Sequence, residues 1–213
     1  MKKLVIIGNG GFAREVEWLV ERINAQSPTW DFLGFIDSDT SSNKVIGDDK
    51  FVTAYPDELY VSIAIGTSDI REKLFEVYKN NFNIRFANLI DPSVIISDRV
   101  SLGYGNIICA GSVITVDIEI GNCNIINLDC TVGHDAVIED FVTINPSVNV
   151  SGNVRLASGT NIGTGTQIIQ GISVGKNSIV GAGAVVNRDL PANCTAVGIP
   201  AKVIKTREVT ANE

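Results

Sequence analysis

The most constraining feature of this sequence is an aliphatic residue that recurs at every sixth position. Counting in sixes from Ile90 to Val186 reaches Leu, Ile or Val at all seventeen positions, without an insertion. A period of six is too short for a helical solenoid, but it fits a parallel β-helix, in which each unit is a short strand followed by a turn. The repeat therefore predicts a triangular prism of roughly five coils, about 25 Å tall, with the recurring side chains pointing inward.

The residues before the repeat follow a different pattern. Short apolar runs typical of strands alternate with stretches of helical periodicity, at residues 4–7, 13–23, 32–36, 61–65 and 69–78. Strands joined by crossover helices form small parallel α/β sheets. We therefore predict two domains, an α/β domain at residues 1–90 and an all-β parallel β-helix at residues 91–213.

Ligands of parallel sheets bind at the carboxyl ends of the strands. Here those ends contain glycines, an aspartate and small polar residues, so we expect nucleotide contacts from Gly8, Gly10, Gly11, Phe12, Asp37, Ser38, Gly66 and Thr67. The spacing Gly8-x-Gly10-x-x-Ala13 also fits a dinucleotide fingerprint. About 90 residues suffice only for a mononucleotide-sized half of such a fold, which favours the diphosphate of a sugar nucleotide over NAD, with a purely structural turn as the remaining alternative.

Composition excludes several classes of function. The chain has 24 acidic and 17 basic residues and a net charge of −7, which argues against general affinity for nucleic acid or anionic lipid. No apolar run approaches the ~18 residues of a membrane span. The single histidine rules out a zinc site with three imidazoles, as in a carbonic anhydrase, and we expect no metal. The four cysteines lack metal-ligand spacing, so we expect reduced thiols and a cytoplasmic protein.

The distribution of charge along the repeat suggests two kinds of ligand. Residues 100–154 contain six carboxylates and no Lys or Arg, which favours a cationic, amine-bearing substrate. From Lys176 onward basic residues predominate, which suits a ligand that carries several phosphate charges.

Four segments of the chain resemble the NeuD/PglD group of sugar acetyltransferases: Gly8–Val16, Ile63–Gly66, Gly133-His134-Asp135 and Val197–Lys202. This resemblance covers nearly the whole chain. It implies a left-handed β-helix of hexapeptide repeats, acetyl-CoA as co-substrate, and a homotrimer with active sites between adjacent prisms. It also implies a role in bacterial surface-glycan synthesis.

The resemblance assigns roles to individual residues. It identifies His134 as the general base that takes a proton from the attacking amine or hydroxyl, since an imidazole is available unprotonated near neutral pH. It makes Asp135 the partner of that base and the N–H of Gly152 the donor to the oxyanion. It places acetyl-CoA against Thr143, Gly152, Gly163, Thr164, Gly181, Ala182, Pro200 and Lys202.

Two positions depart from the group's pattern. Phe12 replaces a histidine that is common in members of the group, and Thr143 stands where a second histidine can contact the acetyl donor. Thr143, Asn145 or a backbone group takes over that second role if it exists.

The expected reaction is direct N-acetylation of a nucleotide-linked amino sugar, with a 4-amino-4,6-dideoxyhexose as the expected sugar. O-acetylation of a sugar of the sialic-acid type and a non-catalytic β-helix scaffold stay open as alternatives. An acceptor screen and a CoA-binding measurement discriminate them.

Overall fold

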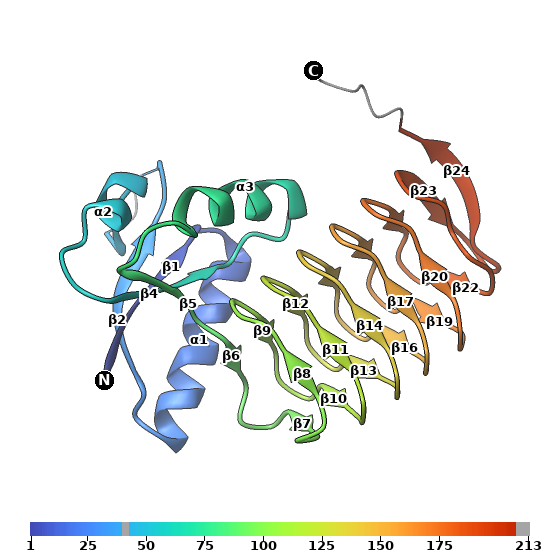
Figure 1. Cartoon of the computed structure of the whole chain (residues 1–213), viewed down its shortest axis with the longest axis horizontal. Helices are drawn as coiled ribbons and strands as arrows, with labels where there is room; N and C mark the ends of the chain where they lie inside the picture. The colour runs from blue at the N-terminus through green and yellow to red at the C-terminus, as the bar shows by residue number, and fades with distance from the viewer. Residues whose placement is uncertain (40–42, 208–213) are drawn as a thin grey trace.

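The α/β domain is a parallel sheet with helices on both faces (Figure 1). Its strands lie in the order β3-β2-β1-β4-β5. Its elements are β1 (Lys2–Ile7), α1 (Gly11–Gln26), β2 (Trp30–Ile36), β3 (Val45–Gly47), α2 (Asp49–Thr53), β4 (Leu59–Ile63), α3 (Ser68–Tyr78) and β5 (Ile84–Phe86). Alternate residues of the central strand β1 face opposite sides: Leu4 and Ile6 pack with α1, whereas Val5 and Ile7 pack with α2 and α3.

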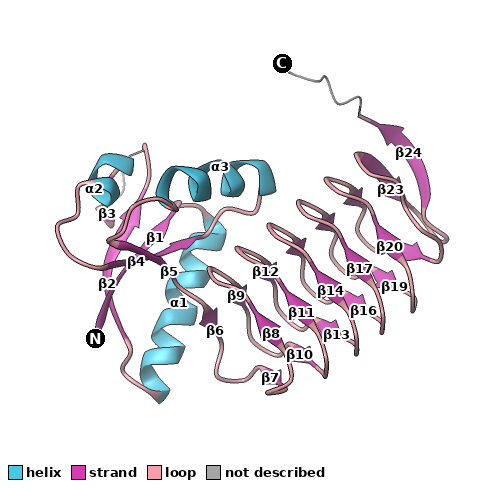
Figure 2. Ribbon diagram, in the orientation of Figure 1, coloured by secondary structure: helices cyan, strands magenta, loops and turns pink. Residues whose placement is uncertain are grey.

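The repeat region forms a three-walled parallel β-helix (Figure 2). The first wall contains β6 (Leu89–Ile90), β9 (Ile107–Ile108), β12 (Ile125–Ile126), β15 (Thr143–Ile144), β18 (Asn161–Ile162), β21 (Ile179–Val180), β23 (Cys194–Val197) and β24 (Lys202–Thr206). The second contains β7 (Ile95–Ile96), β10 (Val113–Ile114), β13 (Thr131–Val132), β16 (Asn149–Val150), β19 (Gln167–Ile168) and β22 (Val185–Val186). The third contains β8 (Ser101–Leu102), β11 (Glu119–Ile120), β14 (Val137–Ile138), β17 (Arg155–Leu156) and β20 (Ser173–Val174).

The prism core is built by the six-residue repeat. Its aliphatic side chains are at most 3% exposed from Ile108 to Val186, and each contributes about 1.5–3 kcal/mol by burial. From β6 to β22 the pairings between coils are parallel and shifted by eighteen residues, so Thr131 lies between Val113 and Asn149. The predicted β-helix is therefore confirmed.

The α/β domain docks on the outer face of the first wall. Leu19 and Val20 of α1 belong to one apolar cluster with Leu89, Ile107 and Ile125 of that wall. Two residues after Val20, Arg22 of the same helix donates two hydrogen bonds to the Asp91 carboxylate, at 2.5 and 3.0 Å. The lower half of the first wall is thereby removed from solvent.

Some elements of the α/β domain differ from those predicted from the sequence. The third predicted strand, at 61–65, is β4 and ends two residues earlier, because the carbonyls of Ile65 and Gly66 turn away to accept hydrogen bonds from Arg71. The short elements β3, α2 and β5 were not predicted, since three to five residues are too few for periodicity.

This computed structural model describes residues 1–39 and 43–207. The last six residues of the predicted second domain lie outside it. Over the described ranges, no helix has the length and hydropathy that crossing a bilayer requires.

Candidate active site

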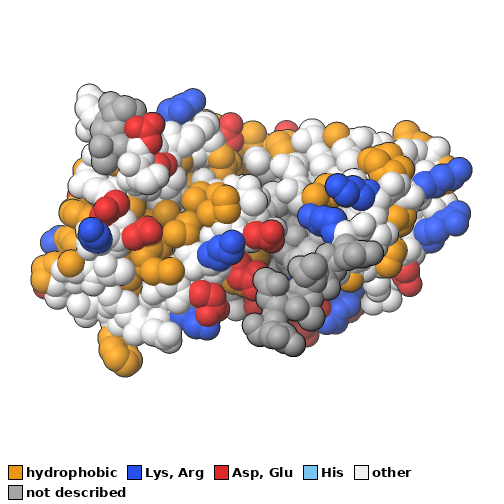
Figure 3. Space-filling model, turned by 90° about the horizontal axis from the view of Figure 1, so that it is seen from above, with side chains coloured by type: hydrophobic (Ala, Val, Ile, Leu, Met, Phe, Trp, Pro, Cys, Tyr) orange, Lys and Arg blue, Asp and Glu red, His pale blue; other side chains and the backbone are white. Residues whose placement is uncertain are grey.

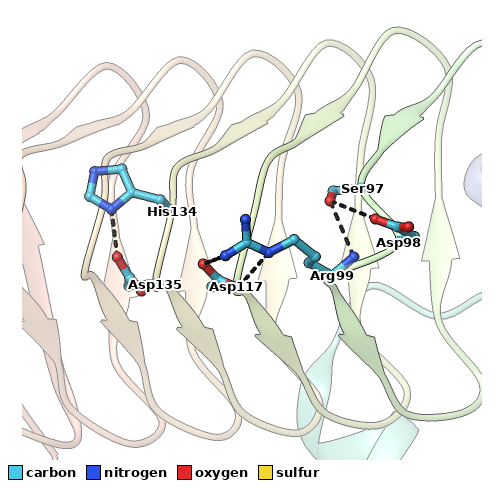
Figure 4. Close-up of polar contacts among 6 residues, drawn as sticks. All are labelled: Ser97, Asp98, Arg99, Asp117, His134 and Asp135. Atoms are coloured by element: carbon cyan, nitrogen blue, oxygen red, sulfur yellow. Dashed lines mark hydrogen bonds and ion pairs between the residues drawn. The ribbon is translucent and has the colours of Figure 1, made fainter.

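His134 lies on the edge between the second and third walls, in the turn from β13 to β14 (Figure 4). Its Nδ1 atom is 2.7 Å from Oδ2 of Asp135. Asp135 has a φ of 59°, and this left-handed turn brings its carboxylate beneath the neighbouring ring. Both side chains are more than half exposed. The structure therefore holds an imidazole oriented by a carboxylate at the surface, which suits a general base.

Gly152 lies one coil above His134 and faces its imidazole. A Cβ atom at Gly152 would approach Nε2 of the ring to 2.5 Å, so any residue other than glycine at this position would displace the ring. The backbone is tied at this level because Asn153 N–H donates to the His134 carbonyl at 2.7 Å. Among the described residues, no acceptor is found for the Gly152 N–H. The candidate base therefore packs against a glycine whose N–H is without an acceptor in the described part of the chain, and such a donor suits a developing oxyanion.

The acidic stretch of residues 100–154 is more nearly neutral than its sequence suggests. Arg99 donates to Asp117 on the edge that carries His134 (Figure 4), and Arg155 pairs with Glu139 on the third wall. Glu139 also accepts hydrogen bonds from Ser158. Burial opposes ionisation of Glu139, but these partners outweigh burial and lower its pKa. Arg99 and Arg155 lie directly before and after the acidic stretch in the sequence, so a count within the stretch leaves them out. Because they neutralise part of its charge, the stretch gives little support for a cationic substrate.

The carboxyl edge of the sheet forms a hollow of about 190 Å³. It brings together Gly8, Asp37 and Ser38, three of the predicted nucleotide contacts, and adds Asp48 and Asp49 from the start of α2. Gly10 and Gly11 follow Gly8 at the N-terminus of α1, where no side chain caps the first backbone N–H groups, and their contact with a phosphate stays a prediction. Thr67 lines a separate hollow with Ser68 and Asn161.

A third hollow, of about 240 Å³, lies where this edge meets the first wall. We call it the acceptor pocket, and it is lined by Phe12, Glu15, Gly66, Ile125, Asn127, Thr143 and Asn145. Phe12 and Gly66 were predicted, but Glu15 and Asn127 were missed. Asn127 was detectable, since it lies eighteen residues before Asn145 and so occupies the same position one coil earlier.

The predicted acetyl-CoA contacts continue from this pocket. Asn127, Asn145, Gly163 and Gly181 are spaced by eighteen residues and form one column along the edge between the first and second walls. Gly163 packs tightly on the coil above, because a Cβ atom there would meet the N of Ala182 at 2.5 Å. The column leads toward β23 and β24, where Lys and Arg side chains gather at the end of the prism (Figure 3).

Thr143 occupies a different environment from the one expected. It is 4% exposed, and its hydroxyl donates to the Gly66 carbonyl at 3.0 Å. The hydroxyl thus joins the first wall to the α/β domain, and its contact with an acetyl donor stays a prediction.

One chain does not bring all the predicted residues together. His134, Asp135 and Gly152 lie on the edge between the second and third walls, whereas the acceptor pocket and the glycine column lie on or beside the first wall. The whole second wall separates the two groups.

The surroundings of the four cysteines disfavour catalysis by a thiol nucleophile. All four cysteines are buried and unpaired. Burial raises the pKa of Cys109 and Cys123 to about 12 and that of Cys130 to about 11, so these thiols stay protonated near neutral pH. Within the part of the chain that the structure describes, no three His, Cys, Asp or Glu side chains gather as metal ligands.

Comparison with known proteins identifies similar enzymes. The family model described as the PglD N-terminal domain matches residues 3–78. A perosamine N-acetyltransferase from Caulobacter crescentus, solved with CoA and GDP-perosamine, is 31% identical with a TM-score of 0.87, over 96% of this chain and 98% of that one. WeeI from Acinetobacter baumannii is 32% identical with a TM-score of 0.86, over 96% and 100% of the two chains.

The acetyltransferase domain of PglB from Neisseria gonorrhoeae, solved with acetyl coenzyme A, is 30% identical with a TM-score of 0.86. The similarity covers 95% of this chain and 99% of that one. A search of curated protein sequences found no match.

Proposed function

Since this chain belongs to the NeuD/PglD-like family of sugar acetyltransferases, with the family's left-handed β-helix, we propose that it transfers an acetyl group from acetyl-CoA to the amine of a nucleotide-linked amino sugar. Similarity over nearly the whole length to enzymes solved with CoA and a nucleotide amino sugar supports this reaction. The observation that carries it is the His134–Asp135 pair, whose imidazole packs against Gly152, a residue whose N–H has no acceptor among the described residues.

The α/β domain holds the acceptor. The hollow at Gly8, Asp37 and Ser38 takes the base and ribose, and the N–H groups at Gly10 and Gly11 take the diphosphate. The sugar then extends into the acceptor pocket, whose size suits one hexose. There the carboxylate of Glu15 is available to a positively charged amine, which favours an amino sugar over a plain hydroxyl acceptor.

Acetyl transfer is direct. The bound ammonium first loses one proton to solvent, which frees the lone pair of the amine. Asp135 orients the His134 ring through Nδ1, leaving Nε2 to take the second proton as the neutral amine attacks the thioester carbonyl. The Gly152 N–H donates to the carbonyl oxygen as it becomes negative. A C–N bond forms, the C–S bond breaks, and the CoA thiolate leaves and receives the proton. The products are the N-acetylated sugar nucleotide and free CoA.

A second copy of the chain completes the site. The base lies on one edge of the second wall and the acceptor pocket lies beside the other, so the two meet only when the base edge of one prism faces the pocket edge of another. Three prisms arranged around a three-fold axis satisfy this requirement with identical contacts, which supports a homotrimer.

Subunit mixing tests this shared site. Inactive His134→Ala subunits and subunits inactivated in the acceptor pocket by Glu15→Arg should regain activity when they are unfolded together and refolded, because some sites then receive both intact halves. A mixture as inactive as its components would contradict the shared site.

The family resemblance and the perosamine enzyme support a 4-amino-4,6-dideoxyhexose as the sugar and surface-glycan synthesis as the setting. The unpaired thiols and the use of acetyl-CoA favour the cytoplasm.

The decisive experiment compares the wild-type enzyme with His134→Ala, using acetyl-CoA and a panel of amino and hydroxyl sugar nucleotides. We expect turnover of a 4-amino sugar and a loss of about a hundredfold or more in kcat for the variant. Undiminished turnover in the variant would refute the assignment of His134 as the base. Absence of CoA binding by calorimetry would refute the proposed acetyltransferase activity.

A further inference from the structure

Arg71 is the largest fully buried side chain of the described residues. It lies one turn after the start of α3 and is 1% exposed. A guanidinium carries five N–H donors, and all five find acceptors here. The acceptors, with their distances from the guanidinium, are Cys123 O (2.7 Å), Ile65 O (2.6 Å), Gly66 O (3.2 Å), Phe141 O (2.6 Å) and Thr143 Oγ1 (2.9 Å).

These acceptors come from both domains. Ile65 and Gly66 form the loop after β4 in the α/β domain, whereas the other three belong to two successive coils of the prism. Cys123 and Phe141 occupy the same left-handed turn position, eighteen residues apart, and both carbonyls point at the guanidinium. One side chain thus binds two coils and the ligand-binding edge of the sheet.

No carboxylate takes part in this cluster, which is unusual for a buried cation. Burial lowers the pKa of Arg71 to about 10, so the side chain is still charged near neutral pH. Four carbonyls and one hydroxyl therefore compensate the charge, and their geometry matches the planar fork of arginine rather than the compact ammonium of lysine.

The cluster forms the rear of the acceptor pocket. Thr143 accepts from Arg71 and donates to the Gly66 carbonyl at 3.0 Å, so Arg71, Thr143 and Gly66 close a ring of hydrogen bonds. Gly66 and Thr143 are themselves lining residues of that pocket. Any shift of the Gly66 loop relative to the first wall changes the width of the pocket directly.

We propose that Arg71 is a positioning residue for the acceptor: by holding the Gly66 loop against Thr143 and two coils of the prism, it fixes the acceptor pocket in the shape that presents the sugar for transfer. This role rests on the proposed function. It requires no contact between Arg71 and the sugar. The acetyl-CoA column of Gly163 and Gly181 lies on other coils and makes no hydrogen bond to Arg71.

The test compares Arg71→Lys, which keeps the charge but has three donors, with Arg22→Ala. Arg22 provides the other anchor between the domains, through Asp91, and does not line the acceptor pocket. We expect Arg71→Lys to lower kcat/KM for the amino sugar by about tenfold to a hundredfold, as a small misplacement of a substrate does, with an unchanged Kd for CoA. Arg22→Ala should lower Tm and leave the acceptor constants unchanged.

A second variant and a second readout keep the test decisive if Arg71→Lys folds poorly. Thr143→Val removes one member of the ring, and we expect it to change the acceptor constants in the same direction and by less. Hydrogen exchange of amides 65–68 should accelerate in Arg71→Lys and Thr143→Val, but not in Arg22→Ala.

The proposal is overturned if both variants keep wild-type acceptor constants and wild-type exchange at residues 65–68. It is also overturned if Arg22→Ala affects the acceptor as strongly. If the wild type acetylates no amino sugar, the proposed function fails, whereas the exchange measurement still decides whether Arg71 holds the loop.

Discussion

Asp135 places its carboxylate Oδ2 2.7 Å from Nδ1 of His134, the residue directly before it in the chain. Neighbours along a strand point to opposite sides, so this contact depends on the left-handed turn at Asp135. Asp117 occupies the same turn position one coil earlier, but its carboxylate binds Arg99. Only at Asp135 does this turn orient an imidazole.

Replacement of Asp135 by Asn should therefore reduce catalysis without unfolding the prism. The amide keeps the shape of the turn, and Asn is common in the left-handed conformation. It loses the charge that orients the ring, and a hydrogen bond to a charged group contributes about 1.5 kcal/mol, so we expect kcat to fall by about tenfold. Steady-state kinetics at saturating substrates measures this.

Asp117→Asn is the matched control, with the same substitution in the equivalent turn one coil away. It should leave kcat unchanged. An equal loss of kcat in both variants would show that the effect comes from surface charge rather than from the contact with His134.

Gly152→Ala should inactivate the enzyme while the fold survives. The new Cβ would lie 2.5 Å from Nε2 of His134, and the ring is the free end of a side chain that can move away. The φ of Gly152 is not positive, so alanine adds no backbone strain there. We expect a kcat as low as that of His134→Ala and a Tm close to wild type, measured by kinetics and calorimetry.

Two comparisons sharpen this prediction. In a His134→Ala background, Gly152→Ala should cost nothing further. Gly133→Ala should unfold the prism, because its Cβ would meet the backbone N of Gly152 at 2.6 Å and no side chain can yield. A stable, active Gly152→Ala enzyme would contradict the placement of the ring.

The prism could be predicted from the sequence because each coil repeats the one before it. An inward residue at Ile108 fixes those at Ile126 and Ile144 through parallel pairing, so local periodicity determines the long-range register. His134 was likewise detectable as the single histidine of the chain within a specific motif. The assignment of His134, Asp135 and Gly152 to catalysis stays a prediction.

The features that could not be predicted from the sequence depend on contacts between residues that are far apart in the chain. Arg71 lies on a helix where an arginine ordinarily faces solvent, and only docking of α3 on the prism buries it. Arg99 and Arg155 lie just outside the acidic stretch and neutralise Asp117 and Glu139 one coil away, which a count along the chain misses.

Glu15→Gln should weaken binding of the amino sugar. The carboxylate lines the acceptor pocket, and a charge-assisted hydrogen bond to an ammonium is stronger than the neutral bond that the amide can make. Loss of about 1.5 kcal/mol raises the acceptor KM by about tenfold. Glu21→Gln, the same change at an exposed position further along α1, is the control and should leave KM unchanged. An acceptor KM unaffected by Glu15→Gln would remove Glu15 from amine recognition.

The cysteines should be unreactive in the folded enzyme. Burial raises the pKa of Cys109 and Cys123 to about 12, and Cys194 is fully buried. We expect Ellman's reagent to modify none of the thiols without denaturant and all four in guanidinium. Mass spectrometry after incubation with acetyl-CoA should find no acetylated cysteine. An acetyl-cysteine formed at the rate of turnover would overturn direct transfer.

The ion pair between Arg22 and Asp91 should make the docking of the two domains depend on pH. Burial alone would raise the pKa of Asp91, but hydrogen bonds from Arg22 and Ser93 outweigh it and lower the pKa to about 2. A carboxyl with a depressed pKa in the folded state stabilises that state above its unfolded pKa, about 3.9, and loses this contribution as the pH falls to about 2.

Asp91→Asn should therefore lower the free energy of unfolding by about 2 kcal/mol at pH 7, since each pKa unit corresponds to about 1.4 kcal/mol and the side chain is buried. Urea unfolding of the wild type and the variant at a series of pH values measures the difference. The difference should be constant from pH 7 to about pH 4 and shrink below that, because protonation then removes the same charge from the wild type. A difference that persists unchanged at pH 2 would mean that Asp91 acts through packing, and the charge of Arg22 would then contribute nothing to holding the domains together.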